Sequence, residues 1–447
     1  MRQTWELRAE FARRLSDLYG REVPAYTTLV DVSQQVNRDV IDDLGPAAER
    51  LGRIERVTAE RHGAIRVGTP AELAQLARIF AGLGMHPTGF YDLREASTEA
   101  AVPVVSTAFR PTDPDELARN PFRVFTSLLA TPDRRFFGAD LARRLEAFLA
   151  RRQLFGLRLL ELADRAEAEG GLPVDAAQEF LALATASFAL STEPVDRAWY
   201  DELSQVSAVA ADIGGVGSTH INHLTPRVLD IDALYARMTG LGIEMIDQIQ
   251  GPPRWAGPDV LLRQTSFKAL AEPRQFIEPD GRRSTGSLRV RFGEVEARGI
   301  ALTRRGRAIY EQQGVAGLPA TEAGLAAERL AVFTLIAVPD RPRDGRLPPS
   351  RPDLAALLAD GWLRAEPVVY EDFLPRSAAG IFRSNLTSDG SRDADQPGAD
   401  LDADWLAGVL QRPLFDPDHL YATHAATAER TALAVLGLPA PHPQEQM

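Results

Sequence analysis

Cysteine is absent from this 447-residue sequence. Its absence excludes disulfides, thiolate metal ligands and a cysteine nucleophile, so a bound metal would need histidine, aspartate or glutamate ligands. The sequence also lacks an apolar run of about 18 residues, the length that indicates a transmembrane helix. The opening segment, MRQTWELRAEFARRLSDLYG, is charged and amphipathic, unlike a signal peptide. We therefore expect a cytoplasmic protein without a membrane partner.

Lysine is almost absent too. Lys268 is the only lysine, and the other 49 of the 50 basic residues are arginine. Coding bias explains the general replacement, but a compact ammonium also fits sites that a planar guanidinium overfills. Lys268 is therefore a candidate substrate contact, with a charge at the edge of the core as the alternative. The net charge is −12 and no basic stripe interleaved with aromatic residues stands out, so we expect no nucleic-acid partner.

Helical and strand-like segments follow one another irregularly. Apolar residues at helical spacing predict helices over residues 1–60: Leu7, Phe11, Leu15 and Leu18. Strand character is predicted at 61–68, 90–93, 102–111 and across 218–310, and helix at 70–84 and over most of 121–192. This mixture favours an α+β fold, and no internal repeat is visible. We expect one catalytic unit over 1–447, with N-terminal helices in 1–60, a metal-binding core in 61–330 and a C-terminal segment in 331–447 that completes the site.

Three of the seven histidines lie in strand-like sequence: His62, His220 and His223. The other four occur in loop-like or surface sequence: His86, His419, His424 and His442. Two histidines and one carboxylate form the facial arrangement of non-haem iron(II) oxygenases, which leaves coordination positions open for substrate and dioxygen. His220 and His223 are three residues apart, so in a strand they point to opposite faces. The spacing alone does not decide which of them would bind an ion.

The segment FGEVEARG carries the candidate carboxylate. Glu294 and Glu296 share a strand face, and buried carboxylates are costly unless they are paired or bind a metal. Arg298, on the same face, is the alternative partner for Glu296. Arg66 shares a strand face with His62 at a Cα distance of about 13 Å, so its guanidinium could bind the carboxylate of a short molecule. The alternative is a structural arginine that pairs with an acidic neighbour such as Glu60.

Several segments, in this order, resemble the 2-oxoadipate dioxygenase/decarboxylase family, also called hydroxyglutarate synthases. They are RHGAIRVGT, GFYDL, STAFRP, PFRVFTSLL, THINHLTPRVLDID, LLRQTSFKAL, RFGEVEARGIALT and VYEDFLPRSAAGIF. The resemblance runs from about residue 10 to residue 435. It implies a fold related to the vicinal oxygen chelate enzymes, with a curved, partly closed β-sheet around the metal and helices outside it.

The same resemblance implies a site. Its metal ligands fall on His62, His223 and Glu294, and the metal is Fe(II). Its substrate-holding arginine falls on Arg66. Ser377 is a further candidate contact, and Arg376 stands where a small apolar residue is expected, which leaves the size of the pocket open.

The implied reaction converts 2-oxoadipate and O2 to 2-hydroxyglutarate and CO2, in lysine catabolism. The 2-oxo acid supplies the reducing electrons, so no second cosubstrate is expected. A zinc-dependent hydrolase with the same three ligands is one alternative, because its open position would hold a water of lowered pKa. A protein that senses a 2-oxo acid without turnover is another.

Overall fold

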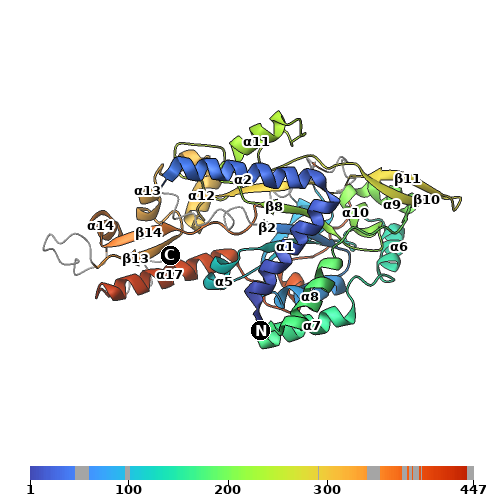
Figure 1. Ribbon diagram of the computed structural model, residues 1–447, viewed down its shortest axis with the longest axis horizontal. Helices are drawn as coiled ribbons and strands as arrows, with labels where there is room; N and C mark the ends of the chain where they lie inside the picture. Colours follow the sequence, from blue (N-terminus) through green and yellow to red (C-terminus); the bar gives the residue numbers. More distant parts are fainter. Residues whose placement is uncertain are drawn as a thin grey trace. The chain divides into compact units, whose positions relative to one another are not determined.

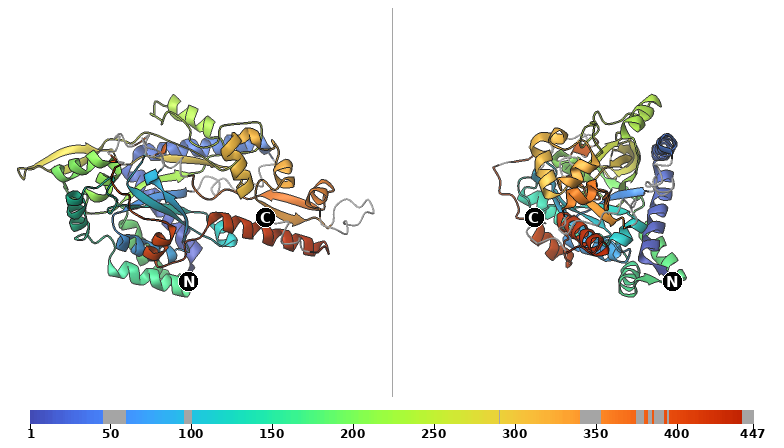
Figure 2. Two further views of the ribbon diagram at one scale, coloured as in Figure 1. Left: turned by 180° about the vertical axis from the view of Figure 1, so that it is seen from behind. Right: turned by 90° about the vertical axis from the view of Figure 1, so that its left-hand side faces the viewer.

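The structure is a computed structural model that describes residues 1–45, 60–95, 101–289, 291–339, 353–374, 380–381, 385, 392–393 and 395–439. It is a mixed α+β protein, as predicted (Figures 1 and 2). The chain divides into two compact units. Unit 1 contains Met1–Gln250, Gln264–Ala297 and Phe373–Leu414, and unit 2 contains Gly251–Arg263, Arg298–Asp372 and Phe415–Met447. None of the described helices is long and apolar enough to cross a membrane. The prediction of one catalytic unit stays a prediction.

Unit 1 is built on a five-stranded sheet with the order β3-β4-β5-β2-β8. Its elements in chain order are β2 (Glu60–Val67), α4 (Pro70–Ala81), β3 (His86–Asp92), β4 (Val104–Arg110), β5 (Arg123–Leu129) and β8 (Ile221–Pro226). β2 runs parallel to β5 and antiparallel to β8. The helix predicted at 70–84 is confirmed, and Thr69 caps it by accepting from the Glu72 amide.

One part of the helical prediction for 121–192 is wrong. Residues 123–129 form β5, whose side chains are all buried between β4 and β2. This strand is buried on both faces, and periodicity alone does not distinguish a buried strand from a buried helix. The remainder is mainly helical, in α6 (Ala139–Leu149), α7 (Leu157–Glu169) and α8 (Val174–Ala186). Gly170 ends α7 in the left-handed conformation.

The strands of unit 1 repeat one topology. The first strand group is β2, α4, β3, β4 and β5, with β5 parallel to β2. The second strand group begins with β8 and α11 (Ile231–Gly240), continues through residues 245–250 and β9 (Leu262–Ser266), and ends with β12 (Glu294–Arg298). Residues 245–250 bridge to β9 in antiparallel fashion, β9 pairs with β12, and a parallel bridge joins Arg227 to Glu296. No repeat was visible in the sequence, because the two groups share strand order and not residues.

Helices α1 (Thr4–Glu22) and α2 (Pro24–Leu44) confirm the helical prediction over the described N-terminal residues. Leu7, Phe11 and Leu15 are buried on one face of α1. The buried Tyr19 hydroxyl lies 2.9 Å from the Asn222 carbonyl oxygen and 2.8 Å from that of Phe292. The Asn222 carbonyl belongs to β8, and the Phe292 carbonyl lies just before β12. The N-terminal helix therefore braces the strands that carry the candidate ligands.

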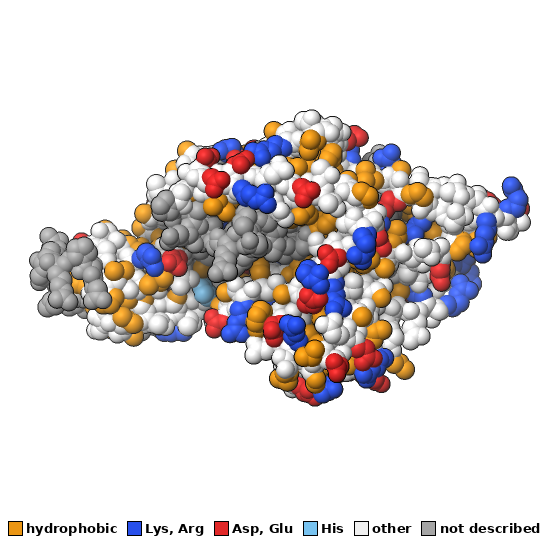
Figure 3. Space-filling view, in the orientation of Figure 1, with side chains coloured by type: hydrophobic (Ala, Val, Ile, Leu, Met, Phe, Trp, Pro, Cys, Tyr) orange, Lys and Arg blue, Asp and Glu red, His pale blue; other side chains and the backbone are white. Residues whose placement is uncertain are grey.

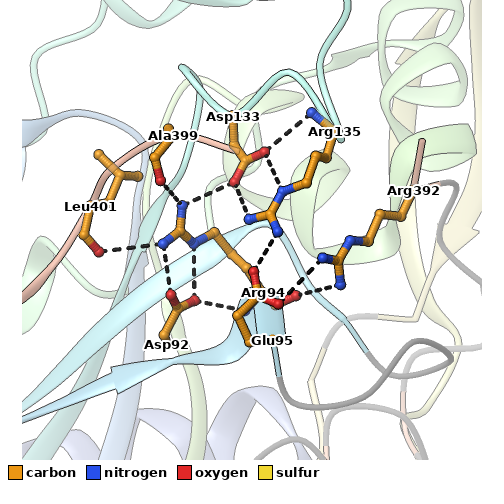
Figure 4. A network of polar contacts seen from close by, with 8 residues as sticks. All are labelled: Asp92, Arg94, Glu95, Asp133, Arg135, Arg392, Ala399 and Leu401. Atoms are coloured by element: carbon orange, nitrogen blue, oxygen red, sulfur yellow. Dashed lines mark hydrogen bonds and ion pairs between the residues drawn. The ribbon is translucent and has the colours of Figure 1, made fainter. Parts of the chain in front are cut away.

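A network of ion pairs and hydrogen bonds around Arg94 and Asp133 joins Arg392, Ala399 and Leu401 to the rest of unit 1 (Figure 4). Arg94 donates to Asp92, to Asp133 and to the carbonyl oxygens of Ala399 and Leu401. Asp133 also pairs with Arg135, and these two arginines hold the pKa of Asp133 below its usual range against the opposing effect of burial. The network therefore joins the chain near residue 400 to the residues that follow β3 and β5.

Unit 2 contains the antiparallel pair β13 (Phe333–Ala337) and β14 (Leu363–Pro367), with α17 (Pro417–Val435) packed on β13. Arg298 donates to the carbonyl oxygens of Tyr370 and Asp372.

On the face drawn in Figure 3, acidic and basic side chains of the described residues are interspersed, without a continuous basic stripe.

Candidate metal centre

Three buried side chains converge in unit 1: His62 from β2, His223 from β8 and Glu294 from the start of β12. One ligand atom from each lies within 4.8 Å of the others. His62 Nε2 is 3.2 Å from Glu294 Oε1, and His223 Nε2 is 3.5 Å from Glu294 Oε2. The first strand group therefore supplies one of these side chains and the second supplies two.

The register of β2 and β8 explains why His223 faces His62. His62 lies opposite Thr225 and Ala64 lies opposite His223, and directly opposed residues share a sheet face. The next pair is Ile65 with Ile221, so Asn222 is an extra residue in β8. Such a bulge interrupts the alternation of side chains along the strand. His220 contacts Asp212 and Asn222 and does not join the cluster of three.

Glu296 orients His62. Its Oε2 atom lies 2.8 Å from His62 Nδ1, so the other ring nitrogen, Nε2, faces Glu294. Burial alone would lower the pKa of His62, but the carboxylates of Glu296 and Glu294 outweigh it and raise that pKa. Glu294 and Glu296 share one face of β12, as strand alternation predicted. A carboxylate on the second nitrogen fixes the orientation of a metal-binding imidazole.

His223 provides the test of whether a metal ion fits here. Burial, together with the nearby His62 and Arg66, lowers its pKa well below the ordinary value, so the imidazole is neutral. Neither of its buried ring nitrogens makes a hydrogen bond with the described residues. An unpartnered buried nitrogen costs free energy, and a neutral imidazole is the form that binds metals. Two imidazoles and one carboxylate therefore fit a metal ion, and iron is one that this donor set suits.

A small cavity adjoins the three side chains. It is lined by His62, Phe125, His223, Gln264, Glu294, Phe373 and Ile381. The Phe373 ring lies 4.9 Å from both the His62 and Phe125 rings, and Gln264 Nε2 donates to Glu294 Oε1. Four of these residues were not predicted from the sequence: Phe125, Gln264, Phe373 and Ile381. A glutamine inside the apolar strand LLRQTSF was an available signal, whereas the three apolar residues look like ordinary core.

The proposed substrate contacts have different surroundings. Arg66 is buried, and its Nη1 atom donates to Asp212 Oδ2 at 2.5 Å. The side chain of Glu60, the alternative partner, lies outside the described part of the structure. Lys268 is partly exposed and pairs with Glu244 at 2.9 Å and Asp247 at 3.4 Å. Neither Arg66 nor Lys268 is among the residues that line the cavity. Arg376 and Ser377 lie outside the described residues.

The fold and this site together place the chain in a class: proteins that have a glyoxalase-like fold and a candidate metal site. A putative glyoxalase superfamily protein from Ralstonia eutropha matches with a TM-score of 0.50 at 22% identity, over 66% of this chain and 84% of that chain. At this identity the likeness shows the fold alone.

The model of the 2-oxoadipate dioxygenase/decarboxylase family matches residues 11–385, and the chain belongs to this family. A Mycobacterium tuberculosis protein named 2-oxoadipate dioxygenase/decarboxylase is 57% identical over 96% of this chain and 98% of its own length. The crystal structure of the Pseudomonas putida hydroxyglutarate synthase in complex with 2-oxoadipate matches with a TM-score of 0.83 at 36% identity, over 97% of this chain and 99% of that chain. The resemblance inferred from the sequence is confirmed, and none of these relatives is named a hydrolase.

Proposed function

We propose that this protein is an iron(II) dioxygenase that converts 2-oxoadipate and O2 to 2-hydroxyglutarate and CO2. The observation that carries the proposal is the buried cluster of His62, His223 and Glu294 in a chain 57% identical to a 2-oxoadipate dioxygenase/decarboxylase. The C1 carboxylate leaves as CO2, one oxygen atom enters the new carboxylate, and the other forms the hydroxyl group. The substrate supplies the electrons, so the reaction balances without a further reductant.

The three ligands would hold the iron, which supplies open coordination positions for the 2-oxo acid and dioxygen. Glu296 holds His62 in its ligand orientation, and Gln264 holds the carboxylate of Glu294. Phe125 and Phe373 line the cavity, and their rings would keep water from the reacting carbon of a bound substrate. Arg66 provides the cation for the far carboxylate of the substrate.

The finer architecture belongs to the same proposal. β2 and β8 join the first and second strand groups, and β12 and β9 continue beyond β8. We infer a curved, partly closed sheet around the iron. The catalytic unit then spans 1–447, with the ligands in 61–330 and the cavity completed from 331–447, where Phe373 and Ile381 lie and where Arg376 and Ser377 are the proposed substrate contacts. The reaction would serve lysine catabolism in the cytoplasm.

Anaerobic reconstitution tests the proposal. Protein loaded with Fe(II), mixed with 2-oxoadipate and then exposed to air, should consume O2 and release CO2 and 2-hydroxyglutarate in equal amounts. Protein loaded with Zn(II) is the control and should do neither. Full iron occupancy without O2 uptake or product would refute the proposed reaction.

A further inference from the structure

Arg66 is held at both its backbone and its side chain by one stretch of chain. The Thr219 hydroxyl donates to the Arg66 carbonyl oxygen at 2.8 Å, and Arg66 Nη1 donates to Asp212 Oδ2 at 2.5 Å. Asp212 lies on α10 (Ala208–Gly214), and Ser207 caps this helix through the Ala210 amide. Arg66 and Asp212 are both buried. The guanidinium therefore has a defined position relative to its strand.

Asp212 is in turn tied to the strand that carries His223. Asn222 Nδ2 donates to Asp212 Oδ2 at 2.9 Å and lies 3.1 Å from His220 Nε2. An amide nitrogen only donates, so His220 Nε2 accepts and the ring is neutral. Burial accordingly lowers the pKa of His220 to about 4, against the opposing effect of Asp212. Asn222 is the extra residue of the β8 bulge, and bulges beside active sites often redirect a side chain.

These contacts form a continuous path from the strand of His223, through Asn222 and Asp212, to the guanidinium of Arg66. We propose that Asp212 is a positioning residue that sets, through Arg66, the distance between the metal site and the far carboxylate of the substrate. This inference rests on the proposed function. Chelation by the metal recognises any 2-oxo acid, so selection by chain length needs a cation at a fixed distance. Arginine is long and flexible, and the ion pair with Asp212 removes that freedom.

A purely structural pair would behave differently. Asp212 would then only neutralise a buried arginine, and its loss would destabilise the fold. Such a loss would affect every substrate alike. Selectivity between substrates therefore distinguishes positioning from simple charge neutralisation.

The test compares three substrates in Asp212→Asn, which keeps the shape of the side chain and removes its charge. 2-Oxoadipate has the charged tail, 2-oxohexanoate has the same length with an uncharged tail, and 2-oxoglutarate is one carbon shorter. We expect kcat/KM for 2-oxoadipate to fall roughly 10–100-fold, the usual effect of losing a group that orients a ligand-binding side chain, mainly through KM. The kcat/KM for 2-oxohexanoate should change little. The ratio of kcat/KM for 2-oxoadipate to that for 2-oxoglutarate should decrease.

Two measurements do not depend on turnover. Metal content should stay at the wild-type level, and anaerobic calorimetry should show weaker 2-oxoadipate binding to the iron-loaded variant. Asp133→Asn is the matched control, because Asp133 is a buried aspartate that pairs with Arg94 and Arg135 (Figure 4) and is not among the residues that line the cavity. It should lose thermal stability and keep wild-type selectivity.

A double-mutant cycle completes the experiment. If Asp212 acts through Arg66, Arg66→Ala combined with Asp212→Ala should be no worse than Arg66→Ala alone. The double variant removes both buried charges, so it leaves neither one unpaired in the interior. Two outcomes would overturn this inference and leave the proposed function standing. One is that the losses of kcat/KM in the two single variants add up in the double variant. The other is that Asp212→Asn lowers kcat/KM equally for substrates with charged and uncharged tails. If Arg66→Ala lowers kcat/KM equally for charged and uncharged tails, the proposed role of Arg66 is wrong, and this inference is wrong with it.

Discussion

His220 and His223 are three residues apart, and their buried side chains have different partners. His223 faces Glu294, whereas His220 contacts Asp212 and Asn222. Asn222, the extra residue of the β8 bulge, lies between the two histidines. At the scale of single residues, one short stretch of chain therefore carries both a candidate ligand and a histidine that contacts the partner of Arg66.

Alanine variants should separate these roles. His62→Ala, His223→Ala and Glu294→Ala should each lose bound iron and activity, because each lacks one of the three ligands. His220→Ala should keep its iron and lose at most roughly 10–100-fold in activity, the usual range for a group outside the ligand set. Iron content after anaerobic reconstitution and desalting is the measurement. Iron retained by His223→Ala and lost from His220→Ala would contradict the ligand assignment.

Lys268 is the second prediction at this scale. The sequence led us to expect that arginine could not replace it. Its ammonium instead pairs with Glu244 and Asp247, which are 76% and 88% exposed, and these carboxylates raise the pKa of Lys268. Exposed ion pairs contribute little to stability. Lys268→Arg should therefore unfold at the wild-type temperature and keep the wild-type kcat/KM for 2-oxoadipate. A clear drop in kcat/KM would instead support the predicted role of Lys268 as a substrate contact.

At the scale of elements, β12 combines a ligand and the group that orients another ligand. Glu294 and Glu296 are two residues apart on one strand face, and Glu296 holds His62 of β2. The parallel bridge between Arg227 and Glu296 fixes β12 beside the end of β8. One short strand thereby links all three candidate ligands.

Glu296→Gln tests this arrangement. The amide can still accept from His62 Nδ1, but it lacks the negative charge that makes the imidazole more basic. Metal affinity should fall roughly 10–100-fold, as for other carboxylates behind a ligating histidine. Anaerobic titration with Fe(II) measures the change. Glu429→Gln is the control, since Glu429 is a buried glutamate paired with Arg329 in unit 2; an equal loss of affinity in both variants would contradict the proposed role of Glu296.

At the scale of the whole molecule, the residues that line the cavity all belong to unit 1. They come from three separate stretches of sequence, the last of which is Phe373–Leu414. Metal binding should stabilise the unit that holds the ligands, by about 2.7 kcal/mol at a metal concentration 100 times the Kd.

Hydrogen exchange measured by mass spectrometry checks this expectation. Loading with Fe(II) should slow exchange in β2, β8 and β12, because opening these strands requires release of the metal. Exchange in α12 (Arg304–Gln313) and α17 of unit 2 should change less. Equal protection throughout both units would show that the metal stabilises the chain as a whole.

Local patterns in the sequence determined much of this protein. The absence of cysteine restricted the ligands to histidine and carboxylates, alternation placed Glu294 beside Glu296, and proline and glycine marked the ends of α4. These features depend on neighbours a few residues apart, so periodicity reveals them. Matching segments in a constant order identified the family.

Only the tertiary structure decided the remainder. The partner of Arg66 is Asp212, 146 residues away in sequence, and the partner of His62 is Glu296, 234 residues away. The register of β2 against β8 places His223 on the sheet face of His62. The repeated topology of the two strand groups is equally invisible in the residues. Strand pairing joins distant segments through backbone hydrogen bonds, which leave no periodic trace in either segment, so these contacts appear only when the chain is folded.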